Sequence, residues 1–151
     1  MFLNPDHITI AVADAEPAIA FFALVGFRKE HVLTIDGGPP ARYMGMPAMK
    51  AQHITLALEG ANPPFEIQLL EFDPAAGTDP GAHPTNLRQR GFNHLAFRVD
   101  DIEAATAHLV ANGVTMLSDE MDYMSRKRRL FEGPEGITLE LVQRGGSDAS
   151  G

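Results

Sequence analysis

The chain has 151 residues, of which 44% are hydrophobic and 21% charged, as expected for one globular domain rather than a disordered chain. Its formal net charge of −8 argues against nucleic acid or an anionic membrane surface as the main partner. The absence of cysteine excludes disulfides, thiolate ligands and a cysteine nucleophile. No apolar run approaches the roughly 18 residues of a membrane span, and the first residues do not resemble a signal peptide, so we expect a cytoplasmic protein.

The first half of the chain is predicted to form a strand, a helix and three further strands. Residues 6–12 alternate between apolar and other side chains, with His7 on the less apolar side. Asp14 is expected to cap a helix that ends at Gly26. Strands are then expected at 27–35, 53–58 and 65–72, with an irregular segment at 42–50.

The second half is predicted to repeat this order after a linker. Residues 73–90 are rich in proline and glycine and are expected to form that linker. A strand follows, with His94 pointing away from its apolar face, and then a helix that Asp100 is expected to cap and that stops at Gly113. Further strands are expected at 115–117, 123–132 and 137–143. The small, polar residues 145–151 are expected to be a disordered tail.

The two halves also resemble each other residue by residue. The run HITIAVADAEPAIAFFALVGF overlays HLAFRVDDIEAATAHLVANGV, and FEIQLLEF overlays ITLELVQR. This overlay pairs His7 with His94 and Gln68 with Glu140. The sequence therefore indicates an internal duplication of a strand–helix–three-strand unit.

Such a duplication predicts an α+β fold made of two tandem βαβββ modules. Neither module alone could bury both faces of a four-stranded sheet. We therefore expect a single domain, 1–151, in which module one (about 5–72) and module two (about 91–143) form a curled mixed sheet around a shared cleft.

The four matched residues are predicted to face this cleft. If each helix covers the apolar face of its strands, alternation turns His7, Gln68, His94 and Glu140 to the opposite face. Taken singly, each is an ordinary strand residue, but their matched places in the repeat favour a metal site. Two imidazoles, an amide and a carboxylate suit divalent Zn, Ni, Co, Mn or Fe, and their single negative charge leaves the ion a Lewis acid.

The segments DHITIAVAD, QLLEF, GFNHLAFRVDDIEAA and FEGPEGITLELV resemble the vicinal oxygen chelate superfamily. This superfamily includes glyoxalase I, methylmalonyl-CoA epimerase, extradiol dioxygenases, and fosfomycin- and bleomycin-resistance proteins. The resemblance covers about residues 6–143 and implies that His7, Gln68, His94 and Glu140 occupy its four ligand positions. Their order is closest to the epimerase and glyoxalase I branch, and the resemblance also implies a homodimer.

The expected function is that of a metal-dependent, glyoxalase-like enzyme, an isomerase, epimerase or lyase that acts on a small carbonyl compound through a metal-stabilised enolate. Glu140 is the predicted base that removes a proton next to the carbonyl. Weaker candidates for substrate binding are Arg98, Arg128, Tyr43 and His53. Arg98 is expected on the His94 face, and Arg128 belongs to a basic run whose alternate members should point opposite ways.

Two other functions stay open. His7, His94 and Glu140 without Gln68 would form the two-histidine, one-carboxylate set of an iron(II) extradiol-type dioxygenase. A non-catalytic protein that binds a drug or metabolite would not need a complete ligand set. Residues 37–58 contain no Asp or Glu, so a two-base epimerase would lack its second carboxylate there.

Overall fold

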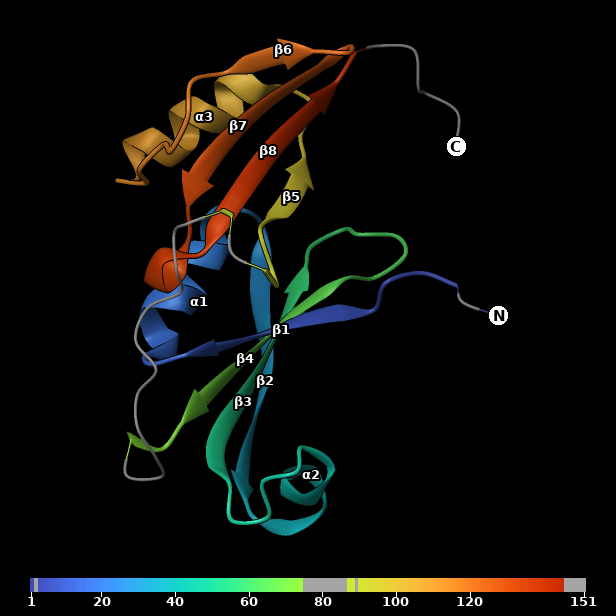
Figure 1. The fold of residues 1–151 in the computed structure, drawn as a ribbon, viewed down its shortest axis with the longest axis vertical. Coiled ribbons are helices and arrows are strands. Elements are labelled where there is room, and N and C mark those ends of the chain that lie inside the picture. Colours follow the sequence, from blue (N-terminus) through green and yellow to red (C-terminus); the bar gives the residue numbers. More distant parts are fainter. Residues whose placement is uncertain (2, 75–86, 89, 146–151) are drawn as a thin grey trace. The chain divides into compact units, whose positions relative to one another are not determined.

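The computed structural model describes residues 1, 3–74, 87–88 and 90–145, and the chain divides into two compact units, Met1–Gly81 and Ala82–Gly151 (Figure 1). Most of the predicted linker, 73–90, and nearly all of the predicted tail, 145–151, lie outside the described residues. In the part of the chain that is described, no helix has the length and apolar character needed to cross a membrane.

The first unit is a mixed four-stranded sheet with a helix on one face. Its elements are β1 (His7–Val12), α1 (Ala15–Leu24), β2 (Phe27–Asp36), α2 (Gly38–Tyr43), β3 (Lys50–Leu58) and β4 (Glu66–Phe72). The strand order is β1-β4-β3-β2, with β1 parallel to β4 and the other pairs antiparallel. The parallel pair is possible because α1, β2 and β3 lie between β1 and β4 in the chain.

Helix α1 packs through its small and aromatic residues. Ala15, Ala18 and Phe22 are buried, and the ring of Phe22 lies edge-on to that of Phe27 at 5.9 Å between centroids. Asp14 caps the helix as predicted, since its side chain accepts a hydrogen bond from the N–H of Glu16. Burying a phenylalanine side chain contributes about 1.5–3 kcal/mol, so this contact fixes α1 on the sheet.

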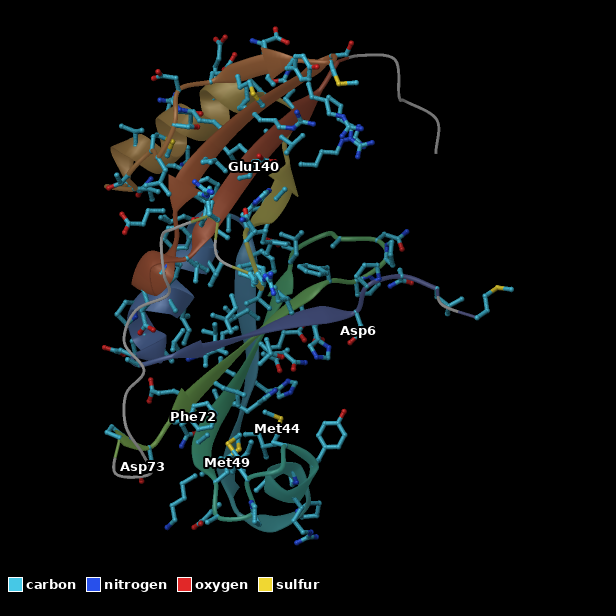
Figure 2. All side chains as sticks on the ribbon, in the orientation of Figure 1. Asp6, Met44, Met49, Phe72, Asp73 and Glu140 are labelled. Atoms are coloured by element: carbon cyan, nitrogen blue, oxygen red, sulfur yellow. The ribbon has the colours of Figure 1, made fainter. Side chains whose placement is uncertain are left out.

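Helix α2 lies where the sequence predicted no helix, between a strand at 27–35 and an irregular segment at 42–50. A second apolar cluster lies beside it, made of Ile35, Ala41, Met49, Ala51 and Leu70, with Phe72 packed against it. Figure 2 shows the side chains of Met49 and Phe72 in this cluster. Two consecutive prolines follow Gly38 at the start of α2, a position that proline tolerates because those N–H groups need no helical partner.

The second unit has the same arrangement. Its elements are β5 (Leu95–Arg98), α3 (Ile102–Ala111), β6 (Met121–Tyr123), β7 (Arg126–Glu132), a 3₁₀ turn (Pro134–Gly136) and β8 (Thr138–Arg144). The strand order is β5-β8-β7-β6, with β5 parallel to β8. Equivalent strands occupy equivalent places in the two sheets, which confirms the predicted α+β fold with two βαβββ units.

Two predictions for the second unit were wrong. The helix cap is Asp101 rather than Asp100, because the Asp101 side chain accepts a hydrogen bond from the N–H of Ala104 at 2.9 Å. The predicted strand 123–132 begins too early: residues 126–132 form β7, and Met124 (φ 52°) and Ser125 (φ 57°) form the turn that joins it to β6. Such turns usually contain Asn or Gly, so this pair gave no turn signal.

The predicted strand at 115–117 is reduced to a single bridge between Met116 and Phe131.

The repeat extends to how each sheet holds its helix. The carboxylate of Glu71 on β4 accepts a hydrogen bond from the N–H of Ala15, the first residue of α1. In the second unit, the amide oxygen of Gln143 on β8 accepts one from the N–H of Ile102, the first residue of α3. Each last strand therefore satisfies a helix N–H that has no partner within its own helix.

Candidate functional site

The strand register puts three of the predicted ligands, His7, Gln68 and Glu140, on the face away from the helix of their unit, and His94 directly precedes β5. In the first unit His7 lies opposite Glu66, and Thr9 lies opposite Gln68. In the second unit Glu140 lies opposite Ala96 on one side and Leu130 on the other. Side chains of paired residues point to the same face, whereas their buried neighbours on β4 and β8 point toward the helices.

The ring of His7 is oriented by the residue before it. Its Nδ1 lies 2.7 Å from Oδ2 of Asp6, at the start of β1 in Figure 2. A carboxylate only accepts hydrogen bonds, so Nδ1 of the neutral imidazole carries the proton and donates it. The lone pair is then on Nε2, the form that a metal ligand requires.

His94 has the same arrangement with a different partner. Its Nδ1 lies 2.7 Å from Oδ1 of Asn93, and Nδ2 of Asn93 donates to the backbone oxygen of Leu87. That second bond fixes the Asn93 amide, so its oxygen faces the imidazole and accepts from Nδ1. The Nε2 atom of His94 again keeps its lone pair.

This Nε2 atom lies near the carboxylate of Glu140 on β8, a residue that Figure 2 labels. It lies 3.9 Å from Oε2 of Glu140, too far for a hydrogen bond, and the Glu140 side chain is 14% exposed. Ligand atoms lie about 2.0–2.2 Å from a zinc-type ion, so two atoms this far apart are within the span of one ion.

Gln68 is held by two side chains on its own face of the sheet. Its Nε2 donates to Oε2 of Glu66 at 3.1 Å, and its Oε1 lies 3.1 Å from Nε2 of His53. Because the Glu66 carboxylate can only accept, the amide group must present its N–H to Glu66 and its oxygen to His53. A carbonyl oxygen has two lone pairs, so Oε1 retains one after accepting from His53.

In the second unit His94 and Glu140 approach each other to 3.9 Å. In the first unit His7 and Gln68 lie on neighbouring strands, two positions apart in the register. Among the described residues, no three His, Asp or Glu side chains are gathered closely enough to hold a metal ion. The chemistry of the pairs nevertheless fits a divalent ion, because both imidazoles present Nε2, and Gln68 and Glu140 are oxygen donors.

The weaker candidates differ in their surroundings. His53 contacts Gln68 directly. Arg98 and Arg128 both lie opposite Val142, on the same face as Glu140. Tyr43 ends α2 with 91% of its surface exposed, and among the described residues it makes no hydrogen bond.

The sequence did not reveal three residues that orient the predicted ligands. Asp6 and Asn93 orient the two imidazoles, and Glu66 orients Gln68. The first two were detectable, since each directly precedes a matched histidine and carries an acceptor oxygen. Glu66 gave no such signal, because it reads as a surface charge at the start of a strand.

The sequence matches the model of the Glyoxalase/Bleomycin resistance protein/Dioxygenase superfamily over residues 4–141. The chain belongs to this superfamily. The finding agrees with the resemblance to the vicinal oxygen chelate proteins, and it leaves the branch within the superfamily open.

Individual relatives and solved structures are similar to this chain to different extents. The uncharacterized protein YaeR of Escherichia coli (strain K12) is 39% identical over 90 residues, which is 59% of this chain and 64% of YaeR. A glyoxalase family protein from Bacillus cereus has a TM-score of 0.81 at 24% identity, with 97% of each chain covered. TnmS3, an antibiotic binding protein from Streptomyces sp. CB03234, has a TM-score of 0.63 at 22% identity, covering 96% of this chain and 99% of TnmS3. The two structures support the fold alone.

Proposed function

We propose that the protein is a metal-dependent enzyme of the epimerase and glyoxalase I type, an isomerase, epimerase or lyase that acts on a small carbonyl compound. His7, Gln68, His94 and Glu140 are the proposed ligands of one divalent ion. The ion would act as a Lewis acid on an oxygen of the substrate. The superfamily resemblance also leads us to propose a homodimer.

The observation that carries this proposal is the shared orientation of the two histidines. In both units an oxygen of the preceding residue accepts a hydrogen bond from Nδ1, and in the second unit Nε2 lies 3.9 Å from Glu140. A side-chain acceptor at the same place in both repeats is the arrangement expected of ligands whose tautomer must be fixed.

Glu140 is the proposed base. It is mostly buried, lies between Ala96 and Leu130, and makes no hydrogen bond with any described residue. Its proton-accepting oxygens are therefore not committed to another group, unlike those of Glu66. Removal of a proton beside the substrate carbonyl needs such a carboxylate within hydrogen-bond reach.

Glu66 supplies a carboxylate that the segment 37–58 lacks. It belongs to the first unit and lies on the same face as Gln68, to which it is hydrogen-bonded. We assign it the positioning of Gln68 rather than proton transfer, since one of its oxygens already accepts from the amide.

Elemental analysis of protein purified without chelators tests this function. We expect about one divalent ion per chain in the wild type, and most of it lost in His94→Ala and Glu140→Ala with an unchanged circular dichroism spectrum. His108→Ala is a matched control, because His108 lies on α3 and not on the strands that carry the proposed ligands, so this variant should keep its metal. Full metal occupancy in both ligand variants would overturn the assignment.

The same preparation separates the alternatives. Oxygen consumption with a catechol would replace the isomerase by an iron(II) dioxygenase that uses His7, His94 and Glu140. An intact fold that never binds metal would favour a binding protein, a function that the antibiotic-binding TnmS3 shows on this fold.

A further inference from the structure

Four arginines share the face of the second sheet that carries Glu140. Arg98 on β5 and Arg128 on β7 lie on either side of Val142, and Arg126 on β7 lies directly opposite Arg144 on β8. Val142 and Arg144 follow Glu140 at spacings of two and four residues along β8, so all share its face. We call Arg98, Arg126, Arg128 and Arg144 the arginine face.

These arginines differ from their neighbours in the same run. Lys127 and Arg129 point to the opposite face, where Nζ of Lys127 lies 3.3 Å from Glu120 and 3.6 Å from Glu103, and Nε of Arg129 donates to the backbone of Ser118. Glu120, with a smaller effect from Glu103, raises the pKa of Lys127. Among the described residues, no carboxylate pairs with any member of the arginine face.

The placement of these cations costs stability. Like charges directly opposite each other on neighbouring strands are destabilising, and Arg126 and Arg144 form such a pair. The fold itself does not require them. At the equivalent places in the first unit, the pair that corresponds to Arg126 and Arg144 is Ala51 and Phe72, and the overlay of the halves places Ala11 where Arg98 stands.

We infer that the arginine face binds an anionic group of the substrate, a carboxylate or a phosphate-type group, while the carbonyl end of the same molecule lies at Glu140. Guanidinium groups hold such oxyanions through paired hydrogen bonds. Arg98 and Arg128 lie level with Val142, about 7 Å along the strand from Glu140. The anionic group is therefore a few bonds from the reacting carbon. This inference rests on the proposed function for the position of the reacting group, and it narrows the substrate to anionic carbonyl compounds.

The test uses phosphonoacetate, which carries a phosphonate and a carboxylate, and its neutral triethyl ester as probes. Isothermal titration calorimetry of the full chain as purified is compared with R98Q/R128Q and with the control K127Q/R129Q. Both double variants lose the same charge from neighbouring positions, but the control changes only the opposite face of the sheet.

We expect phosphonoacetate to bind the wild type more weakly as salt is raised, and the ester not to bind. R98Q/R128Q should bind phosphonoacetate at least tenfold more weakly than the wild type, and the control K127Q/R129Q less than threefold more weakly. The metal content should be the same in the wild type and in both variants. If R98Q/R128Q does not fold, the single exposed substitution R126Q takes its place with the same expected direction.

Two results would overturn the inference: no binding of phosphonoacetate by the wild type, or equal weakening in both double variants. Failure of the proposed function looks different. In that case the protein would lack stoichiometric metal, while phosphonoacetate would still bind in a way that depends on Arg98 and Arg128.

Discussion

The two units share a backbone plan but carry different side chains on the face away from their helices. In the first unit Gln68 is fixed between His53 and Glu66, and the neighbouring end of the face is apolar and lies beside α2. In the second unit Glu140 has no hydrogen bond among the described residues, and the neighbouring end of the face is the arginine face. The position of His53, opposite Leu70, corresponds to that of Arg128, opposite Val142.

The difference shows which part of each unit maintains the fold and which part is free to change. On the helix side, equivalent positions of the repeat stay apolar and buried, such as Phe22 with Leu109 and Ile67 with Leu139. On the opposite side, equivalent positions range from alanine and phenylalanine to arginine. The helix side therefore supplies the packing that both units share, and the opposite side is where a duplicated unit acquires its own packing and chemistry.

The first test concerns the helix side, which the two units share. Replacing the equivalent buried residues Phe22 on α1 and Leu109 on α3 should have the largest effect on stability. Phe22→Ala should lower the free energy of unfolding by about 3–5 kcal/mol and Leu109→Ala by about 2–5 kcal/mol, because each leaves a cavity under its helix. Phe22 is 0% exposed and Leu109 2% exposed. Urea unfolding followed by circular dichroism is suitable, since the chain has no tryptophan.

Phe22→Leu is the matched control. It should lower the free energy of unfolding much less than Phe22→Ala, because leucine fills most of the space that the phenylalanine ring occupies. A loss below about 1 kcal/mol in both alanine variants would mean that the helices are not anchored by these residues, against the usual cost of such cavities.

Replacing His53 tests the sheet face away from the helices, where the two units differ. His53→Ala should weaken metal binding about tenfold, measured by competition with a chelator, because Oε1 of Gln68 loses the group that orients it. His53→Gln, which keeps an N–H donor, should restore part of the affinity. Since Glu140 has no such partner, Arg128→Gln at the corresponding position should leave metal affinity unchanged.

The matched control is His31→Ala. His31 lies on β2 and its Nε2 is 3.4 Å from the hydroxyl of Thr55, so it shares the sheet face but does not touch Gln68. Equal loss of metal affinity in His31→Ala and His53→Ala would show a general effect of losing an imidazole rather than the positioning of Gln68.

The fold was predictable because its signals repeat. Alternation in β1 and β5, acidic residues before each helix and glycines after each helix occur at matching places in both halves, so each half supports the interpretation of the other. The two faces of each sheet followed from the same alternation. The matched histidines likewise identified candidate ligands, whose role as a metal site stays a prediction.

What could not be predicted depends on non-local contacts or on unusual backbone angles. Helix α2 is short and is held by an apolar cluster drawn from β2, β3 and β4, and no local periodicity reveals it. The Met124–Ser125 turn requires positive φ at residues that rarely adopt it. The hydrogen bonds that orient Gln68 come from β3 and from its own strand, and only the register shows that His53 reaches it.

The helix cap of the second unit gives the smallest and most local test. Sequence alone could not distinguish Asp100 from Asp101, since both precede the apolar run. In the structure it is the Asp101 side chain that accepts the hydrogen bond from the N–H of Ala104. Asp101→Ala should therefore lower the free energy of unfolding by about 1 kcal/mol, whereas Asp100→Ala should cost at most a few tenths through the helix dipole. Both substitutions remove one negative charge at the same helix end, so the difference between them isolates the capping bond. Asp14→Ala, at the equivalent position of the first unit, should resemble Asp101→Ala. If Asp100→Ala were the more damaging of the adjacent pair in urea unfolding, the helix would begin one residue earlier, and the matched capping of α1 and α3 would be lost.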